Sequence, residues 1–184
     1  MVYHKGNIMK KLLIVITNIL SLSIAANMKL IKSETNFSAT GKPAFIKANG
    51  NAPLTKAIFQ LLDNKLSGMA EVDLRKLDSG IELRDEHLKK KYLHTDKFPV
   101  ATLVIPKQKV DISGKMNKLK ATLNFHGAKN EILLDTSIEK SGNKLSVISN
   151  FKILLTDYAV TLPSFQGITA ADKVKLRVKT EFEL

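Results

Sequence analysis

The chain contains no cysteine among its 184 residues. Disulfide bonds and thiolate chemistry are therefore excluded, although an oxidising compartment is not, because a chain without thiols has nothing there to oxidise. The sequence also lacks a glycine-rich phosphate loop and the nucleophile elbow of many hydrolases. No apolar run reaches the roughly 20 residues that a membrane-spanning helix needs. Stability must come from packing, and these absences argue against the common catalytic sites.

The charged residues that are present are mostly basic. Lysine and arginine number 29 against 17 acidic residues, which gives a formal net charge of +12, while 44% of the residues are hydrophobic. Such a charge can attract nucleic acid, an anionic membrane face or an anionic ligand head group, or it can serve solubility alone. The lysines are spread singly with acidic residues between them, and no cluster of aromatic residues and arginine forms a base-stacking platform. We therefore expect no nucleic-acid partner, while transient contact with a membrane surface stays open.

The N-terminal segment has the three parts of a secretory signal peptide. Lys10 and Lys11 precede the largely apolar run Leu12–Ile24, and the small residues Ala25 and Ala26 follow it. The alternative is a membrane anchor, but the apolar run is too short to span a bilayer. No cysteine follows it that could carry a lipid.

We therefore predict that residues 1–25 are a signal peptide with an N-terminal extension, which the first eight residues form. Residues 26–184 then make up one domain of ordinary size. The mature protein is expected in the periplasm or outside the cell, and it is not expected to span a membrane.

The rest of the chain alternates apolar and polar residues with the period of a half-buried strand. Within residues 117–125, for example, Leu119, Ala121, Leu123 and Phe125 share one face. Turn residues at 126–129 and 141–143 separate three such segments, which predicts consecutive antiparallel strands. We predict strands at residues 36–40, 44–49, 57–62, 65–74, 100–105, 117–125, 130–139, 144–155 and 174–184.

Residues 83–93 break this pattern with good helix formers, acidic residues first and lysines last, as the helix dipole favours. The sequence thus predicts an all-β fold of about eight antiparallel strands with one helix. A sandwich or a closed barrel fits this pattern, and closure removes exposed strand edges more completely.

The predicted inner face mixes large apolar residues with small ones, including Thr136, Ser149 and Thr180. In a barrel of about eight strands, small inward residues could leave room for one ligand. They could equally fit the taper of the barrel or make space for the helix. The hypothesis of a hollow barrel predicts an apolar pore lined by Phe37, Leu66, Gly68, Ala70, Leu119, Ala121, Leu123, Ile132, Leu134, Phe151 and Phe182.

Several short motifs occur together in a defined order. Arg84-Asp85-Glu86-His87-Leu88 is followed by Tyr92 and Lys97-Phe98-Pro99, and then by the segments 123–129, 156–160 and 174–178. In these motifs the chain resembles the YceI-like family of polyisoprenoid-binding proteins, over about residues 66–184. The resemblance implies a lipocalin-like antiparallel β-barrel with a helix. It also implies a long isoprenoid ligand, such as a polyprenyl phosphate or a quinone, in the barrel pore.

Charged and histidine residues near the predicted helix allow other interpretations. His87 and His94 stand seven residues apart, but no third ligand at a suitable spacing completes a zinc site. Arg84 and Asp85 are expected to pair with each other or to tie the helix to the barrel. Arg84 and Lys89 are hypothetical partners for an anionic head group.

We accordingly predict no catalytic residues, no metal and no cofactor apart from a bound isoprenoid lipid. The first function hypothesis is a carrier for an isoprenoid, a polyprenyl phosphate or a quinone. The second is an envelope protein that binds at its surface or acts in a stress response without a stored ligand. A metal-dependent hydrolase comes third. The sequence sets no oligomeric state, and a homodimer is left open.

Overall fold

The computed structural model describes residues 28–42, 47–162, 164–165 and 168–184. The predicted signal peptide, residues 1–25, lies outside the described residues, as do residues 44–46 of one predicted strand. No helix among the described residues combines the length and the apolar character that crossing a bilayer requires.

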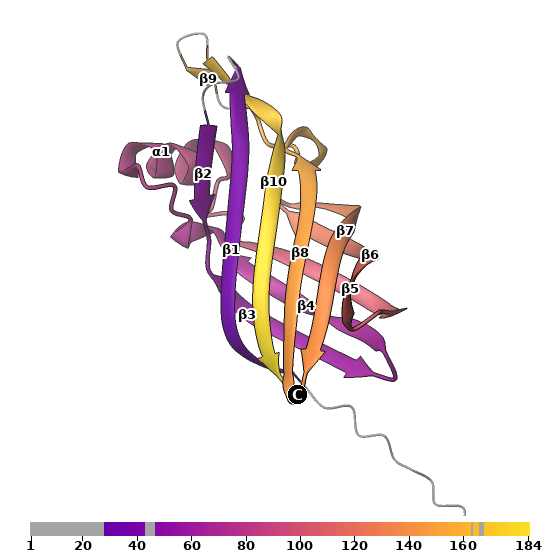
Figure 1. Ribbon diagram of the computed structural model, residues 1–184. Coiled ribbons are helices and arrows are strands. Elements are labelled where there is room, and N and C mark those ends of the chain that lie inside the picture. Colours follow the sequence, from indigo (N-terminus) through magenta and orange to yellow (C-terminus); the bar gives the residue numbers. More distant parts are fainter. Residues whose placement is uncertain (1–27, 43–46, 163, 166–167) are drawn as a thin grey trace, which may run out of the picture.

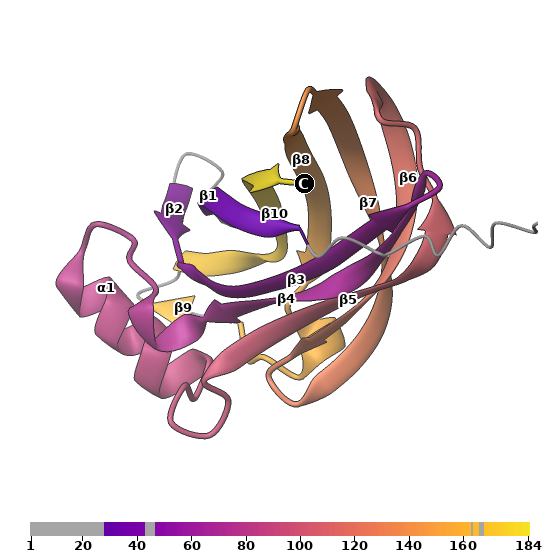
Figure 2. The same ribbon diagram turned by 90° about the horizontal axis from the view of Figure 1, so that it is seen from below.

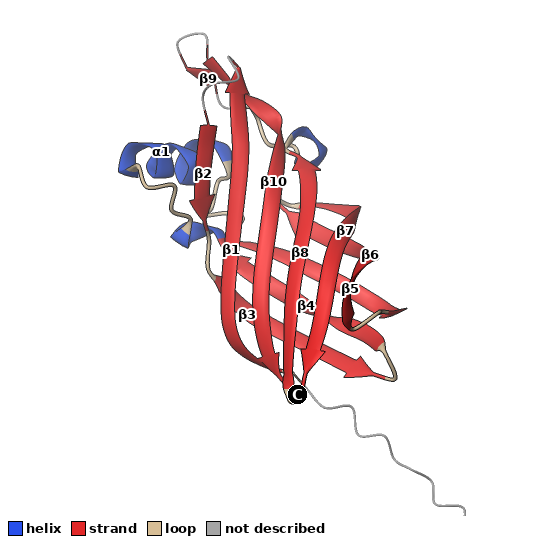
Figure 3. Cartoon of the chain, viewed as in Figure 1, coloured by secondary structure: helices blue, strands red, loops and turns tan. Residues whose placement is uncertain are grey.

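The described chain forms one antiparallel sheet (Figures 1 and 3). Its strands follow the order β2-β1-β10-β8-β7-β6-β5-β4-β3, and the short β9 pairs with β10. Eight of the ten strands have nine or more residues, which confirms the prediction of about eight. The strands are β1 (Lys29–Lys42), β2 (Lys47–Asn51), β3 (Leu54–Leu62), β4 (Lys65–Asp73), β5 (Val100–Lys109), β6 (Ser113–Phe125), β7 (Ala128–Ser141), β8 (Lys144–Leu154), β9 (Ser164–Phe165) and β10 (Ile168–Glu183).

Tight turns join neighbouring strands. His126 and Gly127, both with positive φ, form the two-residue turn between β6 and β7, and Asp63 and Asn64 do the same between β3 and β4. Two successive residues of positive φ give the turn whose twist matches that of the flanking strands. The predicted turn after residue 125 is therefore confirmed.

The sheet curls into a half-barrel with two facing layers. Figure 1 shows β1, β10, β8 and β7 running side by side, with β3, β4 and β5 crossing behind them, and Figure 2 shows the curl from below. The two ends of the sheet approach each other where the Met28 N–H donates to the Phe59 carbonyl at 3.1 Å. No ladder pairs β1 with β3 in the part of the chain that the structure describes. This seam is therefore weakly bonded.

The core lies between the layers and follows the predicted alternation. Leu134, Ile138 and Leu145 have no exposed surface, and Leu119 and Phe182 are almost as buried. The alternate positions face outward, as Lys118 and Lys120 do on β6. The all-β, lipocalin-like fold predicted from the sequence is confirmed.

A helical segment separates β4 from β5, as predicted. The α-helix α1 (Glu82–His87) continues directly as the wider π-helical turn η2 (Leu88–Tyr92), beside β2 at one end of the sheet (Figure 1). Two short 3₁₀ turns, η1 (Leu74–Lys76) and η3 (Thr156–Tyr158), follow β4 and β8. The continuous segment of α1 and η2 carries the first motif, and η3 carries part of a later one.

Candidate ligand-binding site

A cavity of about 230 Å³ lies between the two layers of the sheet. The apolar residues that face inward from both layers form its wall. No charged side chain lines it among the described residues, and its polar lining residues are Thr35, Asn36, Thr136, Ser149 and Thr180. Apolar cavities with few polar groups are typical of sites for apolar small molecules.

Two groups of side chains form opposite parts of the cavity wall. Phe59 and Phe182 meet edge to face, with ring centroids 5.8 Å apart, close to where β10 ends. Leu74, Leu77 and Leu93, from η1 and from the residues that follow η1 and η2, contribute the lining from the helical region. Both the sheet and the helical region therefore contribute to the wall of the cavity.

Three of these polar side chains, those of Thr35, Ser149 and Thr136, lie in one row across the sheet. Thr136 pairs with Ser149, Ser149 with Val178, and Val178 with Thr35 in the strand register. The hydroxyls of Thr136 and Ser149 lie 2.9 Å apart and hydrogen-bond to each other. The Thr35 hydroxyl is buried without a hydrogen-bond partner among the described residues. One wall of an otherwise apolar cavity thus carries hydroxyl groups, which we call the hydroxyl row.

The structure places the eleven residues of the predicted pore lining in two groups. Seven line the cavity: Phe37, Leu66, Ala70, Leu119, Leu123, Phe151 and Phe182. The other four, Gly68, Ala121, Ile132 and Leu134, do not line it.

Packing explains this difference. A Cβ on Gly68 would lie 2.4 Å from Phe59 Cδ1, so the Phe59 ring covers this position. Ala121 and Leu134 are packed into the core, with 2% and no exposed surface. Ile132, opposite Ala121 in the strand register, is partly buried and packs against the core. Alternation identified the inward face of each strand, but it could not tell which inward residues border empty space.

The predicted head-group residues Arg84 and Lys89 do not line the cavity either. The Arg84 guanidinium donates from Nε to Ser79 Oγ at 2.7 Å and also donates to the Ser79 carbonyl. The buried Asp85 carboxylate accepts from the Ser79 N–H at 2.9 Å and from its hydroxyl. Both side chains therefore fix the start of the helix to the preceding loop. A head-group role for Arg84 and Lys89 stays a prediction.

The motif segments converge on His126, at the turn between β6 and β7. Its ring lies against Phe98, with centroids 4.6 Å apart, and stacks on His94 at 5.6 Å. Phe125 packs against Tyr158 at 5.4 Å. These contacts join the segment after the helix, the β6–β7 turn and η3 at one end of the fold, while other motif residues, such as Leu123 and Val178, line the cavity.

Histidines and acidic residues do not gather into a metal site. No three of these side chains lie together within the described ranges. His87, on α1, is exposed, and His94 is stacked on His126.

Comparison with solved structures shows the fold of this chain in other proteins. The crystal structure of Burkholderia cenocepacia BcnA matches with a TM-score of 0.70 and 15% identity, covering 81% of this chain and 95% of that chain. A polyisoprenoid-binding domain from Saccharophagus degradans, implicated in plant cell wall breakdown, matches at 0.65 and 16%, covering 85% and 97%. The Campylobacter jejuni YceI protein matches at 0.61 and 21%, covering 73% and 84%.

A comparison with curated proteins gave no match. The sequence matches the YceI-like domain over residues 28–182, which spans the whole sheet except its last residues. The chain therefore belongs to the YceI-like domain family.

Proposed function

We propose that this protein binds one apolar molecule with a long hydrocarbon chain in the inner cavity and carries it without catalysing a reaction. The observation that carries this proposal is a space of about 230 Å³ between the layers whose wall is apolar apart from Asn36, Thr180 and the hydroxyl row. Burying apolar surface in such a space is favourable, because it removes that surface from water.

The wall chemistry favours a neutral ligand. Burying a charge without a partner costs far more free energy than hydrogen bonding to hydroxyl groups can return. Since no charged side chain of the described residues lines the cavity, a phosphate group would have to stay outside it. A carbonyl or hydroxyl oxygen could instead accept from, or donate to, the unpartnered Thr35 hydroxyl. Among isoprenoids, a quinone or a prenyl alcohol fits better than a buried polyprenyl phosphate.

The size of the cavity sets a second requirement. Its volume of about 230 Å³ exceeds the ~150 Å³ of an engineered cavity that binds benzene. It is below the roughly 300–1,000 Å³ of most ligand pockets. A long chain must therefore widen the space between the layers or leave it at one end. Widening should cost least at the seam between β1 and β3, where the Met28 N–H donates to the Phe59 carbonyl and no strand ladder forms among the described residues.

The Saccharophagus degradans neighbour is described as a polyisoprenoid-binding domain, which supports a ligand of this class. We also propose that the protein is exported to the periplasm or beyond, on the basis of the signal-peptide pattern in residues 1–25.

Native mass spectrometry of the purified chain tests the proposed function. We expect a bound species of added mass that organic solvent extracts as an apolar compound. The variant Ala101→Phe, which places a ring in the cavity wall on β5, should lose most of this species. The control Val104→Phe, on the exposed face of the same strand, should retain it. If both variants retain the ligand equally, or if the wild type takes up no apolar compound, the proposal is wrong and a ligand-free surface role becomes the better explanation.

A further inference from the structure

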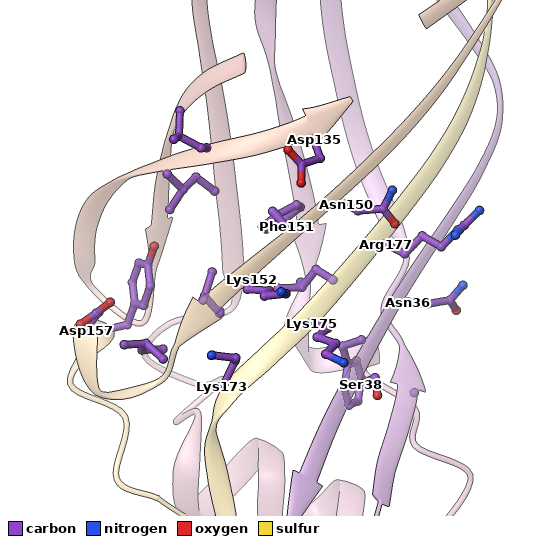
Figure 4. A pocket seen from close by; sticks show the side chains of 18 of the residues that line it. Asn36, Ser38, Asp135, Asn150, Phe151, Lys152, Asp157, Lys173, Lys175 and Arg177 are labelled. Carbon is purple, nitrogen blue, oxygen red and sulfur yellow. The ribbon is translucent and has the colours of Figure 1, made fainter. Parts of the chain in front are cut away.

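A second hollow lies on the outer face of the sheet, opposite the inner cavity. This outer groove has a volume of about 1,450 Å³ and extends over the outward side chains of β6, β7, β8, β10, β1 and β2 (Figure 4). Phe151, Ile153 and Leu176 line both the groove and the inner cavity, so one thickness of sheet separates the two.

Unpaired cations gather in the middle of the outer groove. Three come from alternate positions on β10 and one from β8, and we call them the basic cluster: Lys152, Lys173, Lys175 and Arg177 (Figure 4). None of these four forms an ion pair with another described residue. Further along the same face of β10, Lys179 does pair with Glu34, at 3.6 Å. On β10, Lys179 therefore has an acidic partner, whereas Lys173, Lys175 and Arg177 have none among the described residues.

The neighbours of the basic cluster do not neutralise it. Lys152 stands directly opposite Lys175 in the strand register, an arrangement that destabilises a sheet. Asn150 and Asn36 flank Arg177 on either side, and Ser38 is opposite Lys175. Asp135 stands opposite Asn150 on the neighbouring strand and already pairs with Lys118, and three further carboxylates line the groove, at Asp78, Glu131 and Asp157. The centre of the groove thus has positive charge and neutral hydrogen-bond donors, which suits a phosphate group.

Exposed apolar side chains accompany these cations. Leu133 and Leu154, on β7 and β8, are 62% and 37% exposed and line the same groove. Lysines beside exposed leucines are the combination that binds at the interface of anionic lipids. A protein partner is less suited, because the cores of protein interfaces are poor in lysine and rich in aromatic residues and arginine.

We propose that the outer groove docks the protein onto the anionic phospholipid head groups of a membrane, which enter the hollow and bind the basic cluster. The purpose of this contact rests on the proposed function. A protein that carries a water-insoluble molecule has to collect and release that molecule at a membrane. Docking through the outer groove would leave only one thickness of sheet between the lipid and the inner cavity.

Vesicle co-sedimentation of the purified full chain tests this proposal. We expect binding to vesicles of phosphatidylcholine mixed with phosphatidylglycerol and much weaker binding to phosphatidylcholine alone. The neutral vesicles also report any contribution of residues 1–27, which all variants share. High salt should release the protein, because the Debye length falls from about 10 Å at 0.1 M to about 3 Å at 1 M.

A matched pair of triple variants locates the contact. Lys152→Gln, Lys175→Gln and Arg177→Gln together should weaken binding on the order of a hundredfold, since each cation near an anionic surface contributes about 1 kcal/mol and about 1.4 kcal/mol is tenfold. The control Lys65→Gln, Lys107→Gln and Lys109→Gln removes the same charge from exposed positions on β4 and β5 and also contains a facing lysine pair. It should bind almost as the wild type does. Thermal melts of both variants confirm that each is folded.

Two results would overturn the docking proposal. Equal loss in the two triple variants would mean that net charge alone attracts the protein. Binding to a soluble polyanion such as polyglutamate, without binding to vesicles, would point to an acidic polymer as the partner. Native mass spectrometry on the same samples separates this proposal from the proposed function. A protein that binds vesicles through the basic cluster but never holds an apolar ligand would refute the carrier and leave the docking surface in place.

Discussion

His126 Nδ1 lies 2.9 Å from the carbonyl oxygen of Tyr158, and this contact joins the β6–β7 turn to η3. Because a carbonyl oxygen only accepts, the Nδ1–H is the donor. The Nε2 atom of the same ring is buried without a partner among the described residues, as is the Tyr158 hydroxyl. Burial, and next the charge of Asp157, raise the pKa of Tyr158 above its ordinary value. His126 therefore holds a largely apolar contact in place through one polar bond.

We predict that His126→Ala lowers the free energy of unfolding by about 1–3 kcal/mol, because it removes this bond and the ring contacts with Phe98 and His94. Urea unfolding measures the change. The exposed His87 on α1 serves as the control, and His87→Ala should stay within about 0.5 kcal/mol of the wild type. Equal stability of the two variants would show that the contacts of His126 do not stabilise the β6–β7 turn.

Gly127 follows His126, and its substitution should be costly for two separate reasons. Its φ of 81° favours glycine, and a Cβ there would lie 2.7 Å from Phe98 Cε1. Gly142 has a φ of 59° but no atom within 4 Å of its would-be Cβ. Gly142→Ala should therefore cost only the backbone penalty of about 1 kcal/mol.

We expect Gly127→Ala to be less stable than Gly142→Ala by an additional 1 kcal/mol or so, because the Phe98 ring must move. Thermal unfolding of the two variants side by side measures the difference. The same loss of stability in both would mean that Phe98 moves away freely.

The hydroxyl pair of Thr136 and Ser149 offers a double-mutant test of the hydroxyl row. Thr136→Val alone leaves the Ser149 hydroxyl without its partner at 2.9 Å and should cost about 1–3 kcal/mol. Adding Ser149→Ala removes the orphaned group, so the double variant should recover part of the loss. Chemical denaturation of the three variants gives the coupling free energy. If the two substitutions are simply additive, the hydroxyls are not coupled.

Asp73 gives the stability a dependence on acid. Its carboxylate accepts from Arg75 Nε at 2.9 Å, from the second guanidinium nitrogen at 3.0 Å and from the Arg75 N–H at 3.1 Å. The bonds with the Arg75 side chain, and then that N–H, lower the pKa of Asp73 below its ordinary 3.8. A lowered pKa in the folded state stabilises the protein above the unfolded pKa, and this stabilisation is lost as the pH falls through the folded value.

Asp73→Asn should therefore lower the unfolding midpoint at neutral pH and flatten the decline of stability below about pH 4. Urea midpoints recorded across the acid range measure both effects. Asp63→Asn, at the exposed turn between β3 and β4, is the control and should leave the profile unchanged. A decline as steep in Asp73→Asn as in the wild type would assign the acid dependence to other carboxylates.

The strands β7 and β8 and most of β6 and β10 could be predicted from the sequence, because one face of each is buried and the other is exposed to solvent, whereas β9 and the first residues of β10 were not predicted. The start of β1 could not. The structure begins this strand at Lys29 rather than residue 36, and a register shift between Leu30 and Lys32 leaves Ile31 half exposed. The bulge breaks the period of two, and Thr35 places a hydroxyl on the inner face where the pattern expects an apolar residue.

The two hollows were predictable to different degrees. Small inward residues suggested the inner cavity, but its volume depends on how closely the two layers pack, which no local pattern determines. No single strand indicates the outer groove, because its lysines look evenly spread along the chain. Only the strand register brings Lys152 opposite Lys175, and the signal that could have found them is the outward alternation of β8 and β10 read together.

The central claim, that an apolar chain lies inside the sheet, is tested most directly by methyl-resolved NMR of the purified protein with added farnesol, a neutral prenyl alcohol. We predict intermolecular contacts from the ligand to the methyl groups of Leu103 and Val178, which line the inner cavity. The methyl groups of Leu133, on the outer face, should be unaffected. Contacts to Leu133 without any to Leu103 or Val178 would contradict the account, because the hydrocarbon would then bind on the surface of the sheet.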